Sequence, residues 1–478
     1  MKRRNFITKA SIGAGSLAAL HLSDMVKANY ANAFSTSGGM GIEEALYILE
    51  NGKEKNMMPE LRPEIKNNPR AVFLIETHVD ARKDASGHFT EAAPQLEEAG
   101  TDIAQQLFVK GSVKGGSTFI KPNFTYVPEH CYNRTTGVYS SPDFIVGVVK
   151  HLRDIGSPNI MCGEGPTNSR NHRSGRVYDA FDPAGVYMCE AGYDRWSHFK
   201  KNELNWSEVK DSPVWKRIPH IRPVNDEDNF LINISSMKCH LTGLTTLTVK
   251  NLQGIAPKGY GQFCTSWDSL ERDAIRAGVD FNKDFHKDYY QRVEAWFLKH
   301  RAAGFKRWDW TGSYSRYEKK GGWEAFKKVK NNDEAFTEFM KDVGGLMRHE
   351  TWIHRGLENA QVIKPGINII EGIIGLDGEE LNRDRIGDDQ LCNIIIAGVS
   401  PFEVDAVGSY IMGHDPRELW YTRVAKEKGL GENDVSKIDI YRIKDGEVTQ
   451  VRNVADIKRY RIGLNWARKE NPDERLFW

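Results

Sequence analysis

Short runs of apolar and β-branched residues, each bounded by turn residues, constrain the fold of this chain more than any other feature. Runs that are apolar at nearly every position are typical of strands covered on both faces, as in a parallel sheet. We expect strands at residues 71–76, 117–121, 159–163, 229–234, 366–371 and 391–398.

Helical patterns lie between some of these runs. Residues 143–154 place Phe144, Val148 and Leu152 on one stripe, and residues 402–412 form a second candidate helix that ends at a glycine. The alternation of strands and helices predicts an α/β fold with a largely parallel sheet and flanking helices.

Residues 255–356 interrupt this alternation. They are rich in Lys, Asp, Glu and aromatic residues, with helical stretches such as 289–299. We therefore predict a mostly helical insertion or cap within an α/β core made of residues 34–254 and 357–478. Tryptophans in the insertion fit contacts between helices, which we favour, or a stacking platform for a sugar or another ring.

The first residues have the order of a secretory signal. A charged segment with the pair Arg3-Arg4 is followed by an apolar stretch too short to span a bilayer, and then by the small-x-small cleavage site Ala31-Asn32-Ala33. The adjacent arginines match the twin-arginine consensus more closely than an ordinary Sec signal. We therefore predict that residues 1–33 are a twin-arginine signal peptide, that the translocase is a partner during export, and that the protein is periplasmic.

Charge and hydropathy exclude two classes of partner from our expectations. The full chain has 66 Lys and Arg against 65 Asp and Glu, and the predicted signal removes more bases than acids. The remaining chain is slightly acidic, which argues against nucleic-acid binding. No later segment approaches 18 uninterrupted apolar residues, so we expect no transmembrane segment after cleavage.

The cysteines are scattered along the chain and form no CxxC pair. This pattern removes the usual spacings of ferredoxin-type clusters and zinc ribbons, and it disfavours an electron-transfer subunit. The GEGP sequence after residues 159–163 is not a GxGxxG fingerprint, so no dinucleotide is implied. The sequence does not choose among the disulfide pairings.

Charged or amide residues end or follow one expected strand after another. Ligands of a parallel α/β sheet bind outside the carboxyl ends of the strands. Loop starts are polar in any protein, so a single such residue carries little weight. The residues concerned are Glu76, His78, Asp80, Lys121, Asn123, Glu164, Lys238, His240 and Glu371.

Several segments in order resemble the family catalogued as domain of unknown function 362. They are IKPN, CGEGP, INISSMKCHLTGLTTLTVKNLQG, INIIEGIIGLDGE and IIAGVSPFEVDAVGSYIMGHDP. The resemblance covers most of the chain outside the insertion, and it implies a fold and a site but no established reaction. Relatives usually carry Asp at the positions of Glu371 and Ser400. Here Glu371 keeps an acid with a longer side chain, whereas Ser400 has none, so Asp405 is the nearby carboxylate. The family often has a histidine at the position of His354.

The lysines of these segments predict an anion site. Lys121, Lys238 and Lys250 would act as point charges, and Asn123 and Asn251 would fix the orientation of the ligand. A partly buried lysine among others would have a lowered pKa and could serve as a base, with an acid or histidine as partner. The alternative is three surface lysines. Our catalytic candidates are Lys238, His240, Lys250 and Glu371, and our ligand-binding candidates are Lys121, Asn123, Glu164, Asn251, His354 and Asp405.

A metal half-site is a separate prediction. Glu76, His78 and Asp80 alternate, so an extended chain would present all three on one face, with ligand types that suit a divalent metal. The spacing is common in proteins of other function. The segment from His349 to His354 is not a zincin motif, because its histidines are five residues apart and that motif needs four.

These observations predict an exported α/β enzyme that acts on a small or sugar-linked anion, such as a carboxylate, by Lys, Glu and His acid–base chemistry. A divalent metal is an optional cofactor of this prediction. The rival prediction is a non-catalytic periplasmic protein that binds a ligand or carries a metal with the same lysine-rich cleft. The sequence names no substrate, reaction, metal or oligomeric state.

Overall fold

The computed structural model contains the central sheet and most of the helices around it. Residues 1–41, which include the predicted signal peptide, lie outside the described residues, as does most of the predicted insertion. The structure describes residues 42–83, 89, 92–124, 135–164, 181, 185, 187–190, 201–210, 217–240, 244–256, 319–329, 331–332, 334–335, 338–339, 354–379 and 387–463.

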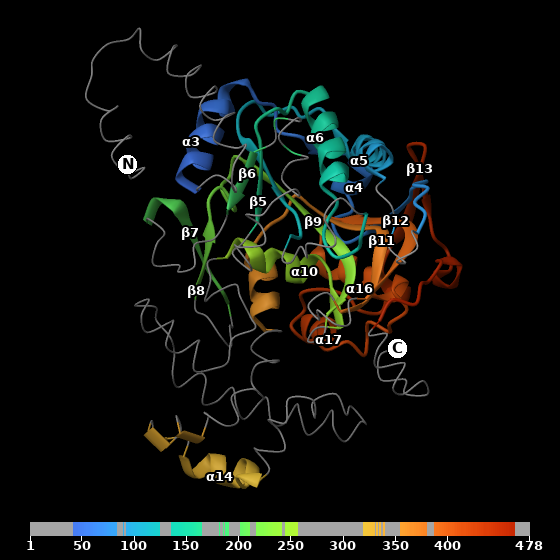
Figure 1. Ribbon diagram of the computed structural model, residues 1–478. Helices are drawn as coiled ribbons and strands as arrows, with labels where there is room; N and C mark the ends of the chain where they lie inside the picture. Colours follow the sequence, from blue (N-terminus) through green and yellow to red (C-terminus); the bar gives the residue numbers. More distant parts are fainter. Residues whose placement is uncertain are drawn as a thin grey trace, which may run out of the picture.

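A ten-stranded sheet forms the centre of the described chain (Figure 1). Strand β10 (Leu244–Thr246) pairs with β9 and lies off the main path. From one edge to the other the strands are β14 (Glu447–Gln450), β13 (Ile440–Lys444), β2 (Val72–Glu76), β12 (Asp388–Gly398), β11 (Ile367–Glu379), β9 (Asn229–His240), β4 (Ser117–Lys121), β5 (Ile160–Glu164) and β6 (Tyr187–Glu190).

Most of these strands run in one direction. The pairs β13–β2, β11–β9, β9–β4, β4–β5 and β5–β6 are parallel, whereas β12 is antiparallel to both of its neighbours. Strand β12 follows β11 after a short connection, which suits antiparallel neighbours, since parallel ones need a long crossover. Every predicted strand falls on a strand of this sheet, so the α/β fold with a largely parallel sheet is confirmed.

Three strands are longer than predicted, and one of them, β12, begins three residues early at Asp388. Strand β9 continues to His240, so Lys238 and His240 lie within the strand rather than after it. Strand β11 continues to Glu379, which places Glu371 in the strand interior. The apolar runs stop early because glycines and polar residues interrupt them, but the backbone pairing with neighbouring strands continues through these residues.

Helices cover both faces of the sheet. Helices α5 (Ala93–Leu107) and α6 (Pro142–Asp154) pack on the face that includes Ile232 and Ile234 of β9. The opposite face includes Leu231 and Met237. It is covered by α3 (Ile42–Gly52), α10 (Thr248–Asn251), α16 (Pro401–Ile411) and α17 (Trp420–Glu427).

The two predicted helices are observed within one residue of their expected bounds, as α6 and α16. Helix α6 begins at Pro142 because Ser141 caps it, with the Ser141 hydroxyl accepting a hydrogen bond from the Phe144 backbone N–H at 3.3 Å. The Ser140 backbone N–H donates to the Asn123 carbonyl, just past the end of β4, at 3.0 Å, so this cap lies near the carboxyl ends of the strands.

The remaining elements are peripheral to the sheet. Strand β1 (Glu60–Leu61) pairs with β3 (Phe108–Val109), and β7 (Leu204–Glu208) pairs with β8 (Arg217–Ile221). Helix α14 (Gly322–Val329) lies away from the sheet (Figure 1). The described residues between 255 and 356 include helix and no strand. No helix in the described part of the chain is both long and apolar enough to cross a membrane. The short elements are α4 (Pro63–Lys66), η1 (Lys53–Lys55), η4 (Lys201–Glu203), η5 (Leu252–Ile255), η7 (Val435–Lys437) and η8 (Val454–Asp456).

Candidate functional site

A buried ion pair lies at the carboxyl ends of β4 and β5. Lys121, the last residue of β4, is 1% exposed, and its Nζ lies 2.7 Å from Oε1 of Glu164, the last residue of β5. The two strands pair in parallel with Ile120 opposite Cys162, so their ends bring the two side chains together. The other carboxylate oxygen of Glu164 accepts a hydrogen bond from the Phe124 backbone N–H at 2.7 Å.

Asn251, at the end of α10, connects this pair to β9. Its Oδ1 accepts a hydrogen bond from Lys121 Nζ at 3.1 Å, and its Nδ2 donates to Asn233 Oδ1 at 2.8 Å. Asn233 in turn donates to Asn368 Oδ1 of β11 at 2.8 Å. Buried amides from α10, β9 and β11 thus form one hydrogen-bonded row that ends at the lysine.

Lys238 supplies a second buried ammonium group to the same region. It is fully buried on β9, and its Nζ donates to Asn123 Oδ1 at 3.0 Å and to the Val138 carbonyl. Burial lowers the pKa of Lys121, Glu164 opposes this effect, and the charge of Lys238 lowers that pKa further. We call Lys121, Asn123, Glu164, Lys238 and Asn251 the lysine cluster.

The segment 138–141 links the lysine cluster to Glu371. The Val138 carbonyl accepts from Lys238, and the Ser140 hydroxyl accepts from the Asn123 backbone N–H at 3.0 Å. The next residue, Ser141, donates its backbone N–H to Glu371 Oε2 at 2.7 Å. Burial raises the pKa of Glu371 to about 8, against the opposing effect of the Ser141 hydrogen bond. Glu371 therefore holds its proton at neutral pH.

The backbone of η5 approaches the Lys121–Glu164 pair closely. A Cβ atom added to Gly254 would lie 2.4 Å from Glu164 Oε1 and 2.6 Å from Lys121 Cε. Both distances are far below van der Waals contact, so only glycine fits at this position without moving the pair. The pair is thus enclosed by main chain on this side.

Lys250 and Asp405 lie beside the lysine cluster and share a small cavity with Tyr421. Lys250 is half-buried and donates to Thr246 Oγ1 at 3.3 Å. Asp405 is buried, and its carboxylate accepts from the backbone N–H groups of Thr248 and Val249 at 2.8 and 3.1 Å. Burial raises the pKa of Asp405 to about 7. The contacts of Asp405 go to the first turn of α10, whose last residue is in the cluster.

The two candidate histidines are placed differently. His240 is buried at the end of β9, on the same strand face as Lys238, and pairs in register with Leu244 of β10. His354 begins the helical residues 354–362. The lysine cluster and Glu371 are joined through the hydrogen bonds of Ser140 and Ser141. The other candidates lie on elements around them, namely His240, Lys250, Asp405 and His354.

The structure adds residues that the sequence did not single out. Asn233 and Asn368 belong to the amide row, and Ser140 and Ser141 connect Asn123 to Glu371. Asn233 and Asn368 had a usable signal, because each is an amide inside an otherwise apolar strand run. Ser141 caps helix α6, and its backbone contact with Glu371 has no sequence signal.

The predicted metal ligands Glu76, His78 and Asp80 alternate at and after the end of β2, and all three are exposed. Glu76 lies 3.4 Å from Arg442, and the Asp80 carboxylate lies 3.8 Å from Arg82. Glu76 and His78 line a common cavity whose lining does not include Asp80. Among the described residues no three His, Cys, Asp or Glu side chains are grouped so that they could hold a metal ion.

Comparison with known proteins gives one match. A family model described as "Domain of unknown function (DUF362)" matches residues 118–410, which is more than half of the chain. The matched span contains the lysine cluster, Glu371 and Asp405. No curated protein and no solved structure matches the chain.

Proposed function

The chain belongs to the DUF362 family, and from the geometry of the lysine cluster we propose that it is an enzyme that acts on a small anionic substrate by proton transfer. The substrate class is a carboxylate or a sugar-linked anion. One observation carries the proposal: two buried lysines, Lys121 and Lys238, lie close enough that the charge of one lowers the pKa of the other. Bringing two ammonium groups together in a buried place is unfavourable unless negative charge offsets them.

Each group has a distinct role in this proposal. Lys121 and Lys238 supply positive charge to the anion, and Asn123 and Asn251 hold the two ammonium groups in place. Glu371 transfers the proton, since an acid with a pKa of about 8 is poised near the working pH. Its carboxylate, the minor form at neutral pH, takes a proton from carbon next to the anionic group, and the resulting acid returns a proton to that carbon. Lys250 and His240 complete the rim of the site.

A non-catalytic binding or carrier protein is the second candidate. Lys121 Nζ already contacts three acceptors, namely Glu164, Asn251 and the Pro122 carbonyl. An ammonium group with all of its N–H donors satisfied is rigid and well suited to holding a ligand by charge alone. This arrangement needs no proton transfer, so turnover separates the two candidates.

Deuterium exchange tests the proposal directly. The purified protein would be incubated in D2O with a panel of small carboxylates, keto acids and sugar acids, and deuterium uptake at carbon would be measured by NMR and mass spectrometry. We expect uptake with the wild type, its loss with Glu371→Gln, and normal uptake with Glu64→Gln, an exposed acid far from the site in sequence. If the wild type binds a compound but shows no deuterium uptake, the result supports the carrier. If the wild type shows no binding and no uptake, the anion site is overturned.

Export and metal binding are further parts of the proposal. We propose a periplasmic location after twin-arginine export, on the basis of Arg3-Arg4 and the cleavage site at Ala33. A metal-assisted version of the reaction would use the exposed groups at the end of β2. Elemental analysis of the purified protein tests it, because a stoichiometric divalent metal that is lost on replacing His78 by alanine is its expected signature.

A further inference from the structure

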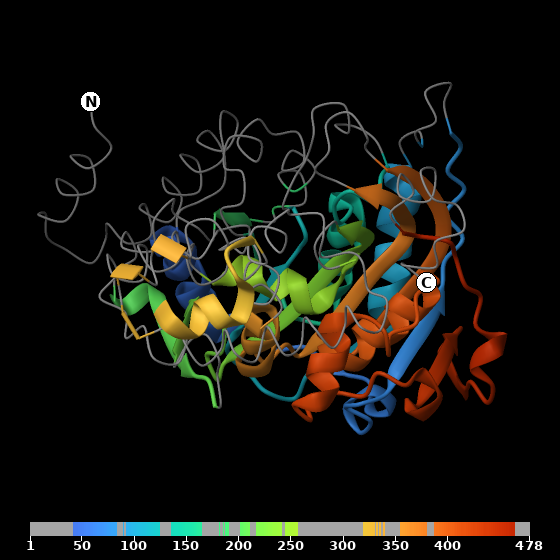
Figure 2. The same ribbon diagram turned by 90° about the horizontal axis from the view of Figure 1, so that it is seen from below.

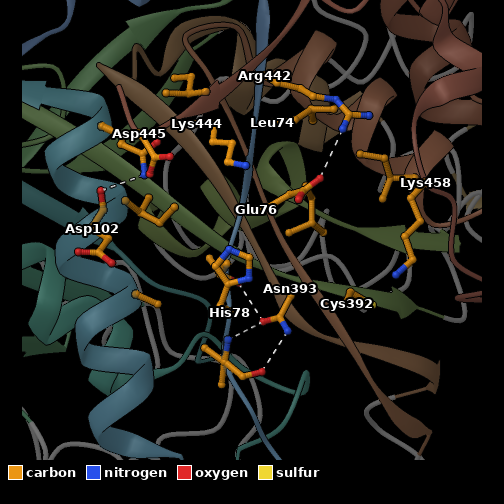
Figure 3. A pocket seen from close by; sticks show the side chains of 18 of the residues that line it. Leu74, Glu76, His78, Asp102, Cys392, Asn393, Arg442, Lys444, Asp445 and Lys458 are labelled. Atoms are coloured by element: carbon orange, nitrogen blue, oxygen red, sulfur yellow. Dashed lines mark hydrogen bonds and ion pairs between the residues drawn. The ribbon is translucent and has the colours of Figure 1, made fainter. Parts of the chain in front are cut away.

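A large cavity lies over the carboxyl ends of β2 and β13, and none of the lysine cluster lines it. Its volume is about 920 Å³, within the range of roughly 300–1,000 Å³ typical of ligand sites. Its walls come from α5, the ends of β2 and β13, the middle of β12 and residues 456–460 (Figure 3). Figure 2 shows the blue strand β2 beside the red C-terminal strands that form this end of the sheet.

One asparagine fixes the floor of this cavity. Asn393 of β12 has a positive φ of 53°, a conformation that asparagine adopts more readily than most residues. Its side-chain oxygen accepts from Thr77 Oγ1 at 3.0 Å and from the Val79 N–H at 3.1 Å, and its Nδ2 donates to the Val79 carbonyl at 3.0 Å. His78, between these two residues, is thereby held at the cavity (Figure 3). These hydrogen bonds within the protein fix the floor of the cavity.

The cavity is lined by charges of both signs. Asp102 of α5 and Asp445 lie on one side, Arg442 with Glu76 and Lys458 lie on the other, and Lys444 lies between them (Figure 3). Asp456 also lines the cavity. Glu98, four residues before Asp102 on α5, also lines the cavity, and this spacing puts both acids on one helix face.

The groups on the two sides differ in how far they are already neutralised. Arg442 lies 3.4 Å from Glu76, which offsets its charge. Within the described part of the chain, Asp102, Glu98 and Lys444 make no ion pair. These two acids and this lysine are therefore available to bind the charged groups of a ligand.

We propose that this cavity binds a zwitterionic ligand of the amino-acid or short-peptide class. The ligand's ammonium group lies beside Asp102 and Glu98, and its carboxylate lies beside Lys444 and Lys458. A purely anionic ligand would be repelled by Asp102 and Glu98, and a purely cationic one by Lys444 and Lys458, so a ligand with both charges matches these groups best. The cavity is large enough for a short peptide.

A cycle of variants and blocked ligands tests this proposal. Alanine peptides of two to five residues, with free ends, N-acetylated or C-amidated, would be titrated into the purified protein by calorimetry at low and physiological salt. Asp102→Asn should weaken binding of the free peptide by about 10-fold and leave the N-acetylated peptide unchanged. Lys444→Met should weaken the free peptide similarly and leave the C-amidated peptide unchanged. Both side chains are exposed, so the variants should fold normally.

Matched controls and contrary results complete the test. Glu64→Gln and Lys364→Met remove exposed charges that do not line the cavity, and they should bind every peptide as the wild type does. The proposal is overturned if no alanine peptide binds, if doubly blocked peptides bind as tightly as free ones, or if acetate alone competes as well as the peptide. The last result would identify a simple anion site. Because the cavity shares no residue with the lysine cluster, these outcomes are independent of the exchange assay.

Discussion

Replacing Glu371 by glutamine should stabilise the protein, and the gain should grow as the pH rises. Burial raises the pKa of the Glu371 carboxyl from its ordinary 4.5 to about 8. Between these two values the unfolded chain has lost the proton and the folded protein still holds it. The free energy of unfolding therefore falls as the pH rises through this window, and this contribution to stability is fully present only below pH 4.5.

The size of the effect follows from the width of the window. One pH unit in which only the folded state holds the proton changes stability by about 1.4 kcal/mol. Between pH 5 and 8 the wild type should thus lose up to about 4 kcal/mol that the variant keeps. Glutamine is nearly the same size, and its carbonyl oxygen can still accept the hydrogen bond from the Ser141 N–H.

Reversible urea unfolding of both proteins, at half-unit steps from pH 5 to 8, measures this difference. Burial also raises the pKa of Asp405 to about 7, so its titration lowers the unfolding free energy with rising pH in the same direction. Subtracting the unfolding free energy of one protein from that of the other cancels this contribution. A difference in unfolding free energy that stays constant across the range would show that Glu371 ionises normally in the folded state. That result would also remove the proton-transfer role proposed for it.

Three shorter tests address the rest of the chain. Gly254→Ala should lower the unfolding free energy by about 1–3 kcal/mol in urea unfolding, because its Cβ would overlap the Lys121–Glu164 pair, and a neutral effect would contradict that packing. Asp405→Asn should lower the unfolding free energy by about 1–3 kcal/mol, because it disturbs the hydrogen bonds to the start of α10. It should also weaken ligand binding in the exchange panel. Unchanged stability would mean that these hydrogen bonds contribute little. Arg3→Lys with Arg4→Lys should leave unprocessed precursor in the cytoplasm by fractionation and immunoblotting, and a processed periplasmic product would reject the twin-arginine assignment.

The strands that the sequence revealed are those buried on both faces. Residues 229–234 and 391–398 are apolar at almost every position because helices cover both sides of the sheet there. Strand β13 was not predicted, because Arg442 and Lys444 interrupt its apolar residues. It lies near the edge of the sheet, next to the last strand, and three of its five side chains are half-buried or exposed.

The residue types of the candidate site were predictable, but their pairing was not. Lys121 and Glu164 were both expected at strand ends, yet nothing in the chain states that β4 lies between β9 and β5. That order decides that Lys121 meets Glu164 on one side and Asn251 of α10 on the other, and that Asn251 in turn donates to Asn233 of β9. Strand order depends on how the helices pack between strands, which is a property of the whole core.

Helix α10 explains why one short motif carries so much of the candidate site. The helix is only four residues long, so its first and last residues are about 5 Å apart along the axis. Asp405 of α16 binds the backbone of its first turn, and Asn251 at its end binds Lys121 and Asn233. Any shift of the start of α10 must therefore move the amide that orients the lysine. In the proposed function, this connection would let Asp405 position Asn251 through α10, and it brings two separate family segments together at one place.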